Sequence, residues 1–303
     1  MDTEELNDRF GIEGEIGFAE LEGELPFAVI SNKYAEADIC LYGAHITGFQ
    51  PRGQVDVLWM SPLSSFEEGK AIRGGIPVCF PWFGPHASDS SLPQHGFARI
   101  SMWEVSETKS LSNGESYLSL KLSSSSKTKN YWPYDFMAEM IFIIGSRLTV
   151  SLRITNTSNE NISYTAALHT YINLSGIENI AIEGLENTHY ENQLDGARYV
   201  QKEKLLKITQ AETRHYFDTE SDCIIHDPFF SRNIRIKKTG SKCSTVWNPW
   251  AETCAGMNDM PDNAFETFIC LETVNKINNI IHLAPGEMHE TTAILNVESS
   301  VFS

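Results

Sequence analysis

Leu148-Thr-Val-Ser-Leu-Arg-Ile-Thr155, followed by Ile162-Ser-Tyr-Thr-Ala-Ala-Leu168, is the stretch that indicates the fold most clearly. Large apolar residues occupy every second position through most of both runs, which is the period expected of β-strands with one buried face. Between them, Asn156-Thr-Ser-Asn-Glu-Asn161 is rich in residues that favour turns. The two runs are therefore predicted to be strands, and together they resemble a β-hairpin.

Segments with the character of short strands recur along the chain, separated by Gly, Asn, Ser and Pro. Helical patterns are rare, and only Asp2–Phe10 and Met260–Phe268 could each supply a short helix. Many strands with few crossover helices argue for an all-β antiparallel sandwich rather than a Rossmann fold or a TIM barrel. Because no repeat or linker is visible, residues 1–303 are expected to form a single domain. The other predicted strands are Phe27–Ser31, Ala37–Leu41, Tyr117–Leu122, Met137–Ile144, Ile180–Ile182, Asn233–Lys237 and Thr292–Val297.

The chain of 303 residues is strongly acidic, with 23 Lys and Arg against 40 Asp and Glu and a formal net charge of −17. This charge opposes binding to nucleic acid and to anionic membranes. No run reaches the roughly 18 apolar residues of a membrane helix, and Met1–Phe10 shows no signal peptide. Six scattered cysteines form no CxxC pair, so we expect free thiols and a cytoplasmic protein.

One segment that breaks the strand pattern is Ile72-Arg-Gly-Gly-Ile-Pro-Val-Cys-Phe-Pro-Trp-Phe-Gly84. Its prolines disrupt strand ladders, and Gly74 and Gly75 permit backbone conformations that are closed to other residues. Aromatic faces, Trp82 among them, beside Arg73 suit a sugar or another polar ring. The alternative is a purely structural loop.

A second unusual segment is Leu92-Pro-Gln-His-Gly-Phe-Ala-Arg99. It brings the polar side chains of Gln94, His95 and Arg99 together on a turn that contains a glycine. Convergent donors on a loop are typical of a binding site. The alternative is a surface loop whose side chains are solvated.

Two ionisable residues stand out near strand ends. In the predicted strand Ile162–Asn173, His169 lies at an odd position and therefore points away from the apolar face. The small residues Thr165 and Ala167 share its face, which would leave room for a ligand. Glu272 ends a continuous apolar run, so it is either a paired structural charge or a base whose pKa is raised by desolvation. For His169, the alternative is that the side chain has a purely structural role.

The sequence predicts no metal site, because it has no HExxH motif and no cluster of Cys and His. P-loop, GxGxxG and GxSxG patterns are also absent. These absences argue against the common nucleotide-binding and serine-hydrolase functions.

A series of short motifs runs from residue 43 to residue 272. They are Gly43-Ala-His-Ile46, Leu58-Trp-Met-Ser61, Arg73-Gly-Gly-Ile-Pro77, Phe80-Pro-Trp-Phe-Gly84, Gln94-His-Gly-Phe-Ala-Arg99, His169-Thr-Tyr171, Trp247-Asn-Pro249, Asp259-Met-Pro-Asp262 and Cys270-Leu-Glu272. Their order and spacing resemble those of the D-hexose-6-phosphate mutarotases, which are glucose-6-phosphate 1-epimerases of the aldose 1-epimerase superfamily. Each motif alone is weak, but the set is highly specific.

The resemblance implies a galactose mutarotase-like β-supersandwich, in agreement with the strand pattern. It also implies an isomerase that interconverts the α and β anomers of a hexose 6-phosphate without a cofactor or a metal. By match to the family's motifs, His169 would be the general acid and Glu272 the general base. The matching substrate-binding positions are Arg73, Gln94, His95 and Arg99, with the arginines suited to the phosphate.

The sequence departs from the family pattern at one substrate contact. Members often carry Asp-Arg-x-Tyr where this chain has Thr213-Arg-His-Tyr216, so Thr213 replaces the aspartate. Asp218 is close in sequence and is the candidate substitute. The catalytic pair is not affected by this difference.

Two alternatives to a hexose-6-phosphate epimerase follow from these residues. A mutarotase for unphosphorylated aldoses has less use for two arginines, whose planar forks suit phosphate oxygens. A non-catalytic sugar-phosphate-binding protein of the same fold would need neither His169 nor Glu272. The partner that we expect is the phosphorylated substrate, with the chain acting as a monomer.

Overall fold

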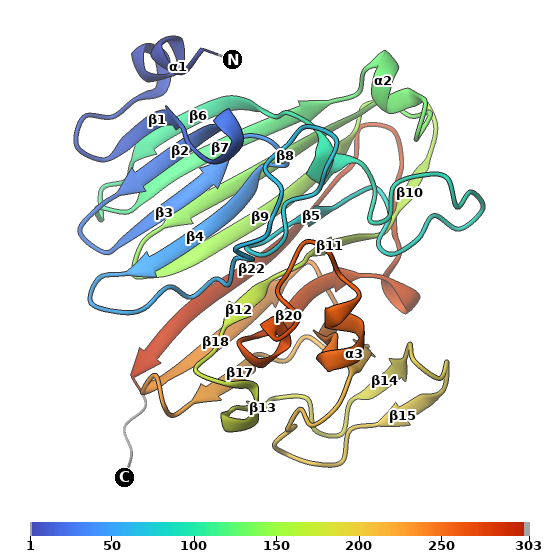
Figure 1. Cartoon of the computed structure of the whole chain (residues 1–303). Coiled ribbons are helices and arrows are strands. Elements are labelled where there is room, and N and C mark those ends of the chain that lie inside the picture. The colour runs from blue at the N-terminus through green and yellow to red at the C-terminus, as the bar shows by residue number, and fades with distance from the viewer. Residues whose placement is uncertain (1, 300–303) are drawn as a thin grey trace.

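The strand-forming segments pair into four antiparallel sheets in the computed structural model, which describes residues 2–299 (Figure 1). The first sheet follows chain order, with β1 (Ile16–Glu20), β2 (Pro26–Ser31), β3 (Ala35–Cys40) and β4 (His45–Pro51). A small second sheet pairs β10 (Ile162–Tyr164) with β21 (Ile281–Leu283).

Two sheets of eight strands form the body of the molecule. In spatial order, the back sheet contains β13 (Ala181–Glu183), β17 (Cys223–Asp227), β18 (Arg232–Thr239), β22 (Met288–Ser299), β9 (Arg147–Asn156), β8 (Phe136–Ile144), β7 (Ser116–Ser123) and β6 (Glu104–Ser110). The site sheet contains β15 (Arg198–Val200), β14 (His189–Asn192), β16 (Glu212–Phe217), β19 (Cys243–Asn248), β20 (Phe268–Asn275), β11 (Ala166–Leu168) and β5 (Val78–Cys79), with β12 (Tyr171–Asn173) also paired to β20. Almost every strand expected from the sequence is present within a few residues of its predicted ends.

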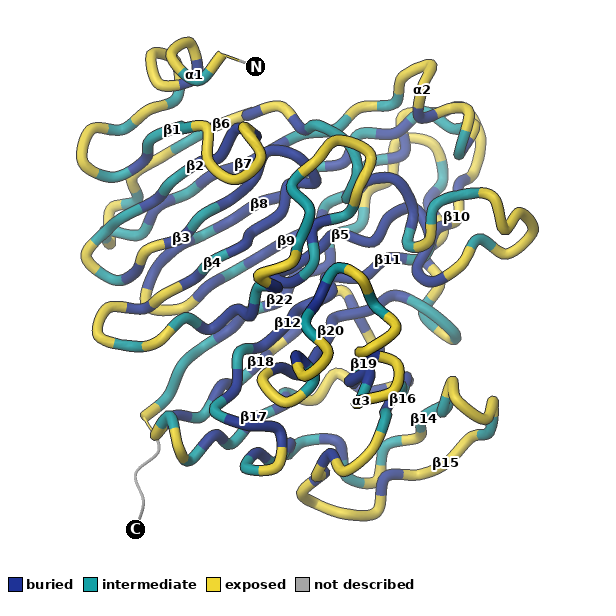
Figure 2. The backbone as a smooth tube through the Cα atoms, viewed as in Figure 1, coloured by how far each residue is buried: buried dark blue, intermediate teal, exposed yellow. Residues whose placement is uncertain are grey.

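One continuous cluster of buried apolar side chains lies between these sheets. Leu168 and Leu271 of the site sheet meet Leu152 and Leu295 of the back sheet in this cluster. Figure 2 shows that burial is concentrated in the central strands, whereas the turns that join them are exposed. Because side chains alternate along a strand, the neighbours of these leucines face away from the core. The site sheet therefore has a second face that is free to carry polar groups.

Helices are short and peripheral, as the sequence predicts. Helix α1 (Thr3–Phe10) begins at Asp2, whose carboxylate accepts a hydrogen bond of 2.9 Å from the Glu4 amide and caps the helix. The others are α2 (Ser126–Lys129) and α3 (Trp250–Ala255). Within residues 2–299, no helix combines the length and apolarity needed to cross a bilayer. All six cysteines are buried and unpaired.

The helix predicted over Met260–Phe268 is wrong. This segment contains only a single 3-10 turn at Ala264–Glu266, and α3 precedes it in the chain. The side chain of Asn248 explains the difference, because its amide donates 2.9 Å hydrogen bonds to the carbonyls of Phe265 and Phe268. These bonds hold the segment as a loop against the end of β19.

The predicted hairpin of residues 148–155 with 162–168 is also wrong. Strand β9 pairs with β8 and β22, whereas β10 pairs with β21 and β11 pairs with β5 and β20. The turn residues 156–161 direct the chain from the back sheet into other sheets and not back along β9. Asn156 stabilises this crossing, because its amide donates to the carbonyls of Glu160 (2.8 Å) and Leu283 (2.9 Å).

Candidate active site

A row of polar side chains crosses the free face of the site sheet. His215 of β16 lies opposite Thr245 of β19, and Thr245 lies opposite Glu272 of β20. His169 follows β11 directly, next to β20. Because directly opposed residues share a face, the sheet itself brings three distant segments of sequence into one line. The prediction that His169 points away from the apolar face is confirmed.

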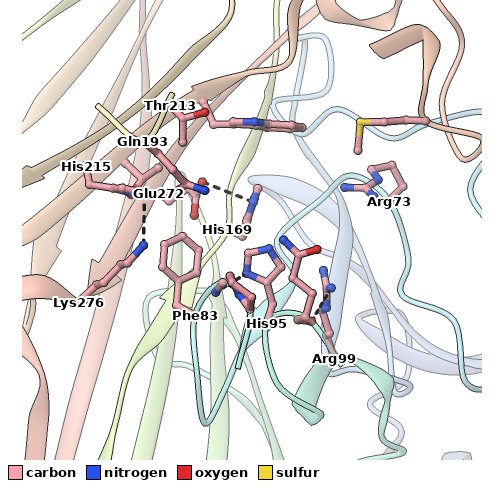
Figure 3. Close-up of a pocket in the computed structure, with 16 residues that line it drawn as sticks. Arg73, Phe83, His95, Arg99, His169, Gln193, Thr213, His215, Glu272 and Lys276 are labelled. Carbon is pink, nitrogen blue, oxygen red and sulfur yellow. Dashed lines mark hydrogen bonds and ion pairs between the residues drawn. The ribbon is translucent and has the colours of Figure 1, made fainter. Parts of the chain in front are cut away.

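These groups line a partly open cavity of about 180 Å³ that loops border on its other sides (Figure 3). The lining residues are Arg73, Phe83, Gly84, Pro85, Gln94, His95, Arg99, His169, Gln193, Thr213, His215, Thr245, Trp247, Met257, Glu272 and Lys276. Five of the predicted substrate-binding or catalytic side chains converge here with Arg73. They come from segments that lie as far apart in sequence as residues 73 and 272.

His169 and Glu272 form a buried polar contact in the pocket. His169 Nε2 lies 3.4 Å from Glu272 Oε1, and the side chains are 10% and 1% exposed. Burial raises the pKa of Glu272 well above its usual value and lowers the pKa of His169 to about 3. The same dry environment thus disfavours the charged form of each group, and one proton shared by the pair can reside on either.

Aromatic rings hold His169 in place. Tyr171 stacks on its imidazole, with ring centroids 5.0 Å apart and an interplanar angle of 19°. Trp247 contacts it edge-on at 5.9 Å. The Nδ1 atom of His169 and the Oε2 atom of Glu272 are buried and lack hydrogen-bond partners within the described residues. A rigid pair with unused polar atoms is suited to take a ligand's hydrogen bonds.

The long strand predicted over Ile162–Asn173 is interrupted beside the site. The Thr165 amide donates to the Pro81 carbonyl at 3.2 Å, and the His169 amide donates to the Pro77 carbonyl at 3.1 Å. The prediction that Thr165 and Ala167 leave room for a ligand is wrong. Phe83 packs there, with its amide donating to Thr165 Oγ1 at 2.8 Å, and its ring becomes a wall of the pocket.

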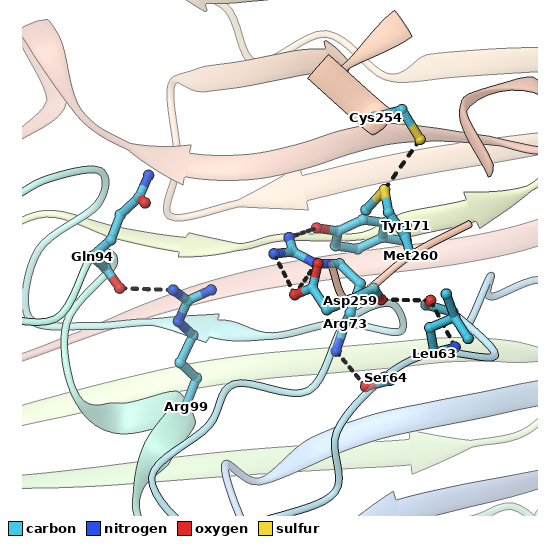
Figure 4. A network of polar contacts seen from close by, with 10 residues as sticks. Leu63, Ser64, Arg73, Gln94, Arg99, Tyr171, Cys254, Asp259 and Met260 are labelled. Atoms are coloured by element: carbon cyan, nitrogen blue, oxygen red, sulfur yellow. Dashed lines mark hydrogen bonds and ion pairs between the residues drawn. The ribbon is translucent and has the colours of Figure 1, made fainter. Parts of the chain in front are cut away.

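Arg73 is held in a neutralising network (Figure 4). Its Nε and Nη2 donate to Asp259 Oδ2 at 3.0 and 2.8 Å, and its Nη1 donates to the Tyr171 hydroxyl at 2.9 Å. The following glycines, Gly74 and Gly75, have φ of 114° and 57°. A Cβ on either would lie 2.5 Å or less from a backbone oxygen, so the predicted need for glycine is confirmed.

Arg99 is in a different electrostatic position. Its Nη2 donates to the Gln94 carbonyl at 2.8 Å, and its buried Nε has no partner. Across the described chain, no carboxylate lies within ion-pair distance of this guanidinium. Its positive charge is therefore available to an anion in the pocket, whereas that of Arg73 is balanced by Asp259.

His95 is an uncharged donor in the same loop. Its backbone has a positive φ of 65°, and its amide donates to the Gly84 carbonyl at 2.7 Å. Because the Gly84 amide donates to Nδ1 at 3.1 Å, the proton of the neutral ring belongs on Nε2. Burial lowers the pKa of His95 to about 2, so it does not add to the positive charge of the pocket.

Two predicted substrate contacts lie outside the pocket, and we correct them. The indole of Trp82 packs into the core and donates from Nε1 to the Pro93 carbonyl at 2.9 Å. Its neighbour Phe83 provides the aromatic wall. Asp218 is exposed and accepts a 3.0 Å hydrogen bond from Asn278, while Thr213 itself lines the cavity.

Several residues of the pocket were not predicted from sequence. Lys276 had a usable signal, because an even separation from Glu272 along an extended segment places it on the same face. The pairing of Asp259 with Arg73 had none, since 186 positions separate them. The other lining residues that were not predicted as site residues are Phe83, Gly84, Pro85, Gln193, Thr213, His215, Thr245, Trp247 and Met257. Residues 2–299 contain no group of His, Cys, Asp and Glu side chains that is arranged to hold a metal ion.

Comparison with known proteins places this geometry in a family. The family model described as aldose 1-epimerase matches residues 27–296. The chain belongs to the aldose 1-epimerase family. It is 34% identical over 251 residues to a Salmonella typhimurium protein named "Putative glucose-6-phosphate 1-epimerase", covering 83% of each chain. A protein of the same name from Cenchrus ciliaris is 31% identical over 260 residues, covering 83% of this chain and 78% of that one.

The solved structures agree with this assignment. The crystal structure of a Salmonella typhimurium protein titled a "putative mutarotase" superposes with a TM-score of 0.89 at 29% identity, covering 96% of both chains. The predicted mutarotase-like β-supersandwich is thereby confirmed. As a member of the aldose 1-epimerase family, the chain is an epimerase, which is a kind of isomerase.

Proposed function

We propose that this epimerase interconverts the α and β anomers of hexose 6-phosphates, with His169 and Glu272 as the acid and base. The observation that carries the proposal is the buried His169–Glu272 contact in a cavity that also exposes an unpaired arginine, Arg99. Mutarotation requires one group to remove the anomeric proton and another to protonate the ring oxygen. The pocket offers such a pair and, in Arg99, a charge suited to phosphate.

The proton transfers follow from the state of this pair. In the form that starts the reaction, the Glu272 carboxylate accepts the proton of the hydroxyl on C1, and the His169 imidazolium protonates O5. The C1–O5 bond breaks and the open-chain aldehyde forms. After rotation about the C1–C2 bond, the roles of the two groups reverse and the ring closes on the other face of C1. Positioned acid and base catalysis of this kind contributes about 10²–10⁴-fold for each group.

The proton count of the pair supports this cycle. The neutral pair and the ion pair hold the same number of protons, so converting one into the other requires only a transfer between the two groups. Burial favours the neutral pair at rest, in which Glu272 holds the proton and His169 is uncharged, and the 3.4 Å contact lets that proton pass to His169 when the cycle starts. The enzyme therefore needs no proton from solvent during a turnover.

The preference for a phosphate rests on Arg99 more than on Arg73. A guanidinium with a free donor edge can give two parallel hydrogen bonds to phosphate oxygens. Arg73 is already bonded to Asp259 and Tyr171, so we propose that it positions the sugar as a net-neutral donor. Gln94 and His95 supply further uncharged donors beside it.

A polarimetric assay with pure α-glucose 6-phosphate and pure α-galactose tests the proposal. We expect protein-dependent acceleration for the phosphate ester and little or none for galactose. Acceleration of galactose alone would contradict the role of Arg99. If neither sugar responds while inorganic phosphate still binds, the pocket belongs to a sugar-phosphate-binding protein.

A further inference from the structure

Lys276 is a second cation of the pocket that has no ion-pair partner in the part of the chain that the structure describes. It follows β20 directly, and its Nζ lies 5.2 Å from the centroid of the Phe83 ring. Burial lowers the pKa of Lys276, whereas the nearby Glu191 and Glu272 favour its charged form without forming an ion pair with it. Figure 3 shows Lys276 and Arg99 on opposite sides of the pocket, with His169 and Glu272 between them.

The hydrogen bonds around Lys276 leave its ammonium with donors to spare. Its Nζ contacts His215 Nε2 at 3.4 Å, but that same atom lies 2.8 Å from Gln193 Oε1. If Nε2 carries the proton toward Gln193, with Nδ1 accepting from Thr245 at 2.8 Å, it cannot also accept from Lys276. All three N–H donors of the ammonium are then available to a ligand.

The order of groups across the pocket follows the order of atoms in a hexose 6-phosphate. With the C6 phosphate at Arg99, the ring oxygen at His169 and the C1 hydroxyl at Glu272, the next atom along the ring is C2. Beyond Glu272, on the side of the pocket away from Arg99, lies Lys276, with His215 and Gln193 beside it.

We propose that Lys276 is a specificity-determining residue that faces the substituent on C2, an inference that rests on the proposed function. An ammonium donates to a hydroxyl oxygen or an anionic group, and it repels a second cation. The pocket therefore selects hexose 6-phosphates that carry oxygen at C2. It discriminates against 2-amino-2-deoxyhexose 6-phosphates, whose C2 substituent is itself an ammonium.

The test compares glucose 6-phosphate with glucosamine 6-phosphate, using exchange spectroscopy of the anomers at pH 7. For the wild-type protein we expect kcat/KM to favour glucose 6-phosphate by about tenfold or more. Lys276→Met keeps the length of the side chain and should reduce that preference by about tenfold, whereas Lys276→Arg should retain it. Lys109→Met, which removes an exposed lysine of β6, is the matched control and should leave the ratio unchanged.

A second experiment tests whether the substrate preference depends on the charge of the C2 substituent. At a pH high enough for the C2 amine of glucosamine 6-phosphate to lose its proton, the preference of the wild-type protein for glucose 6-phosphate should become smaller. The preference of Lys276→Met should not change. An active Lys276→Met protein that keeps the wild-type ratio would overturn the role of Lys276 while the proposed function stands. A wild-type protein that exchanges neither substrate would overturn the proposed function itself. If Lys276→Met does not fold, Lys276→Gln takes its place under the same criteria.

Discussion

Leu271 and Glu272 are neighbours in β20 and are almost equally buried, at 1% and 2% exposed, but they face opposite sides of the site sheet. Leu271 joins the continuous apolar core, where burial stabilises the fold. Glu272 faces the pocket, where the same degree of burial destabilises its charged form. One strand thus carries a stabilising residue and a functional residue side by side, and mutations should separate the two effects.

The largest expected effect is on catalysis at the pocket face. Glu272→Gln keeps the shape of the side chain but removes the base, so exchange should fall by about 10²–10⁴-fold. Binding of the phosphosugar should persist, because Arg99 is untouched. Single-turnover exchange rates and calorimetric binding measure the two properties separately. A variant with full activity would show that another group is the base.

The next effect belongs to the core face. Leu271→Ala leaves a cavity in a fully packed region and should lower the free energy of unfolding by about 2–5 kcal/mol. The kcat of the folded fraction should remain near that of the wild-type protein, because the side chain points away from the pocket. Urea unfolding together with exchange kinetics would check this. A loss of kcat as severe as that of Glu272→Gln would remove the contrast between the two faces.

A smaller effect should come from the loop that faces Glu272. Arg99→Ala removes the unpaired guanidinium and should raise KM for glucose 6-phosphate about 10–100-fold, since charged hydrogen bonds contribute about 1.5–3 kcal/mol. Inhibition by inorganic phosphate should weaken in parallel. Arg147→Ala on β9 is a control at a position remote from the pocket. Unchanged inhibition by phosphate would remove Arg99 from the phosphate site.

The smallest effect is a pH-dependent gain in stability. Because the pKa of Glu272 is raised in the folded state, its contribution to stability is present at low pH and is lost as the pH rises above the unfolded value near 4.5. Glu272→Gln should therefore gain stability relative to the wild-type protein as pH increases, by up to about 1.4 kcal/mol per pH unit. Leu271→Ala should show no such trend. Urea unfolding at pH 6, 7 and 8 checks this. If the carboxyl group of Glu272 were not desolvated, the difference in unfolding free energy between Glu272→Gln and the wild-type protein would be the same at all three pH values.

The contrast between the two faces could be predicted from sequence for His169, which lies in an alternating strand, but not for Glu272, which ends a continuous apolar run. Period two correctly placed His169 away from the apolar face and identified most strands. The hairpin prediction failed because a turn sequence specifies a reversal of the chain and not the sheet that the next strand joins. Asn156 bonds to Leu283, a residue 127 positions away, and this contact leads the chain out of the back sheet.

The loops were predicted less well than the sheet. Gly74 and Gly75 occupy backbone conformations that favour glycine, and His95 and Arg99 line the cavity, but Trp82 was chosen where its neighbour Phe83 forms the wall. No local pattern determines which of two consecutive aromatic residues faces a cavity. The charge balance of the pocket could not be predicted from sequence either, because the ion pair between Arg73 and Asp259 depends on the tertiary fold.

The central claim is tested most directly by exchange spectroscopy of glucose 6-phosphate at anomeric equilibrium. We predict magnetisation transfer between the α and β anomers at a rate proportional to the concentration of wild-type protein, and transfer at the spontaneous rate with Glu272→Gln. Transfer that stays at the spontaneous rate with folded wild-type protein, or that is equally fast with both proteins, would contradict this account.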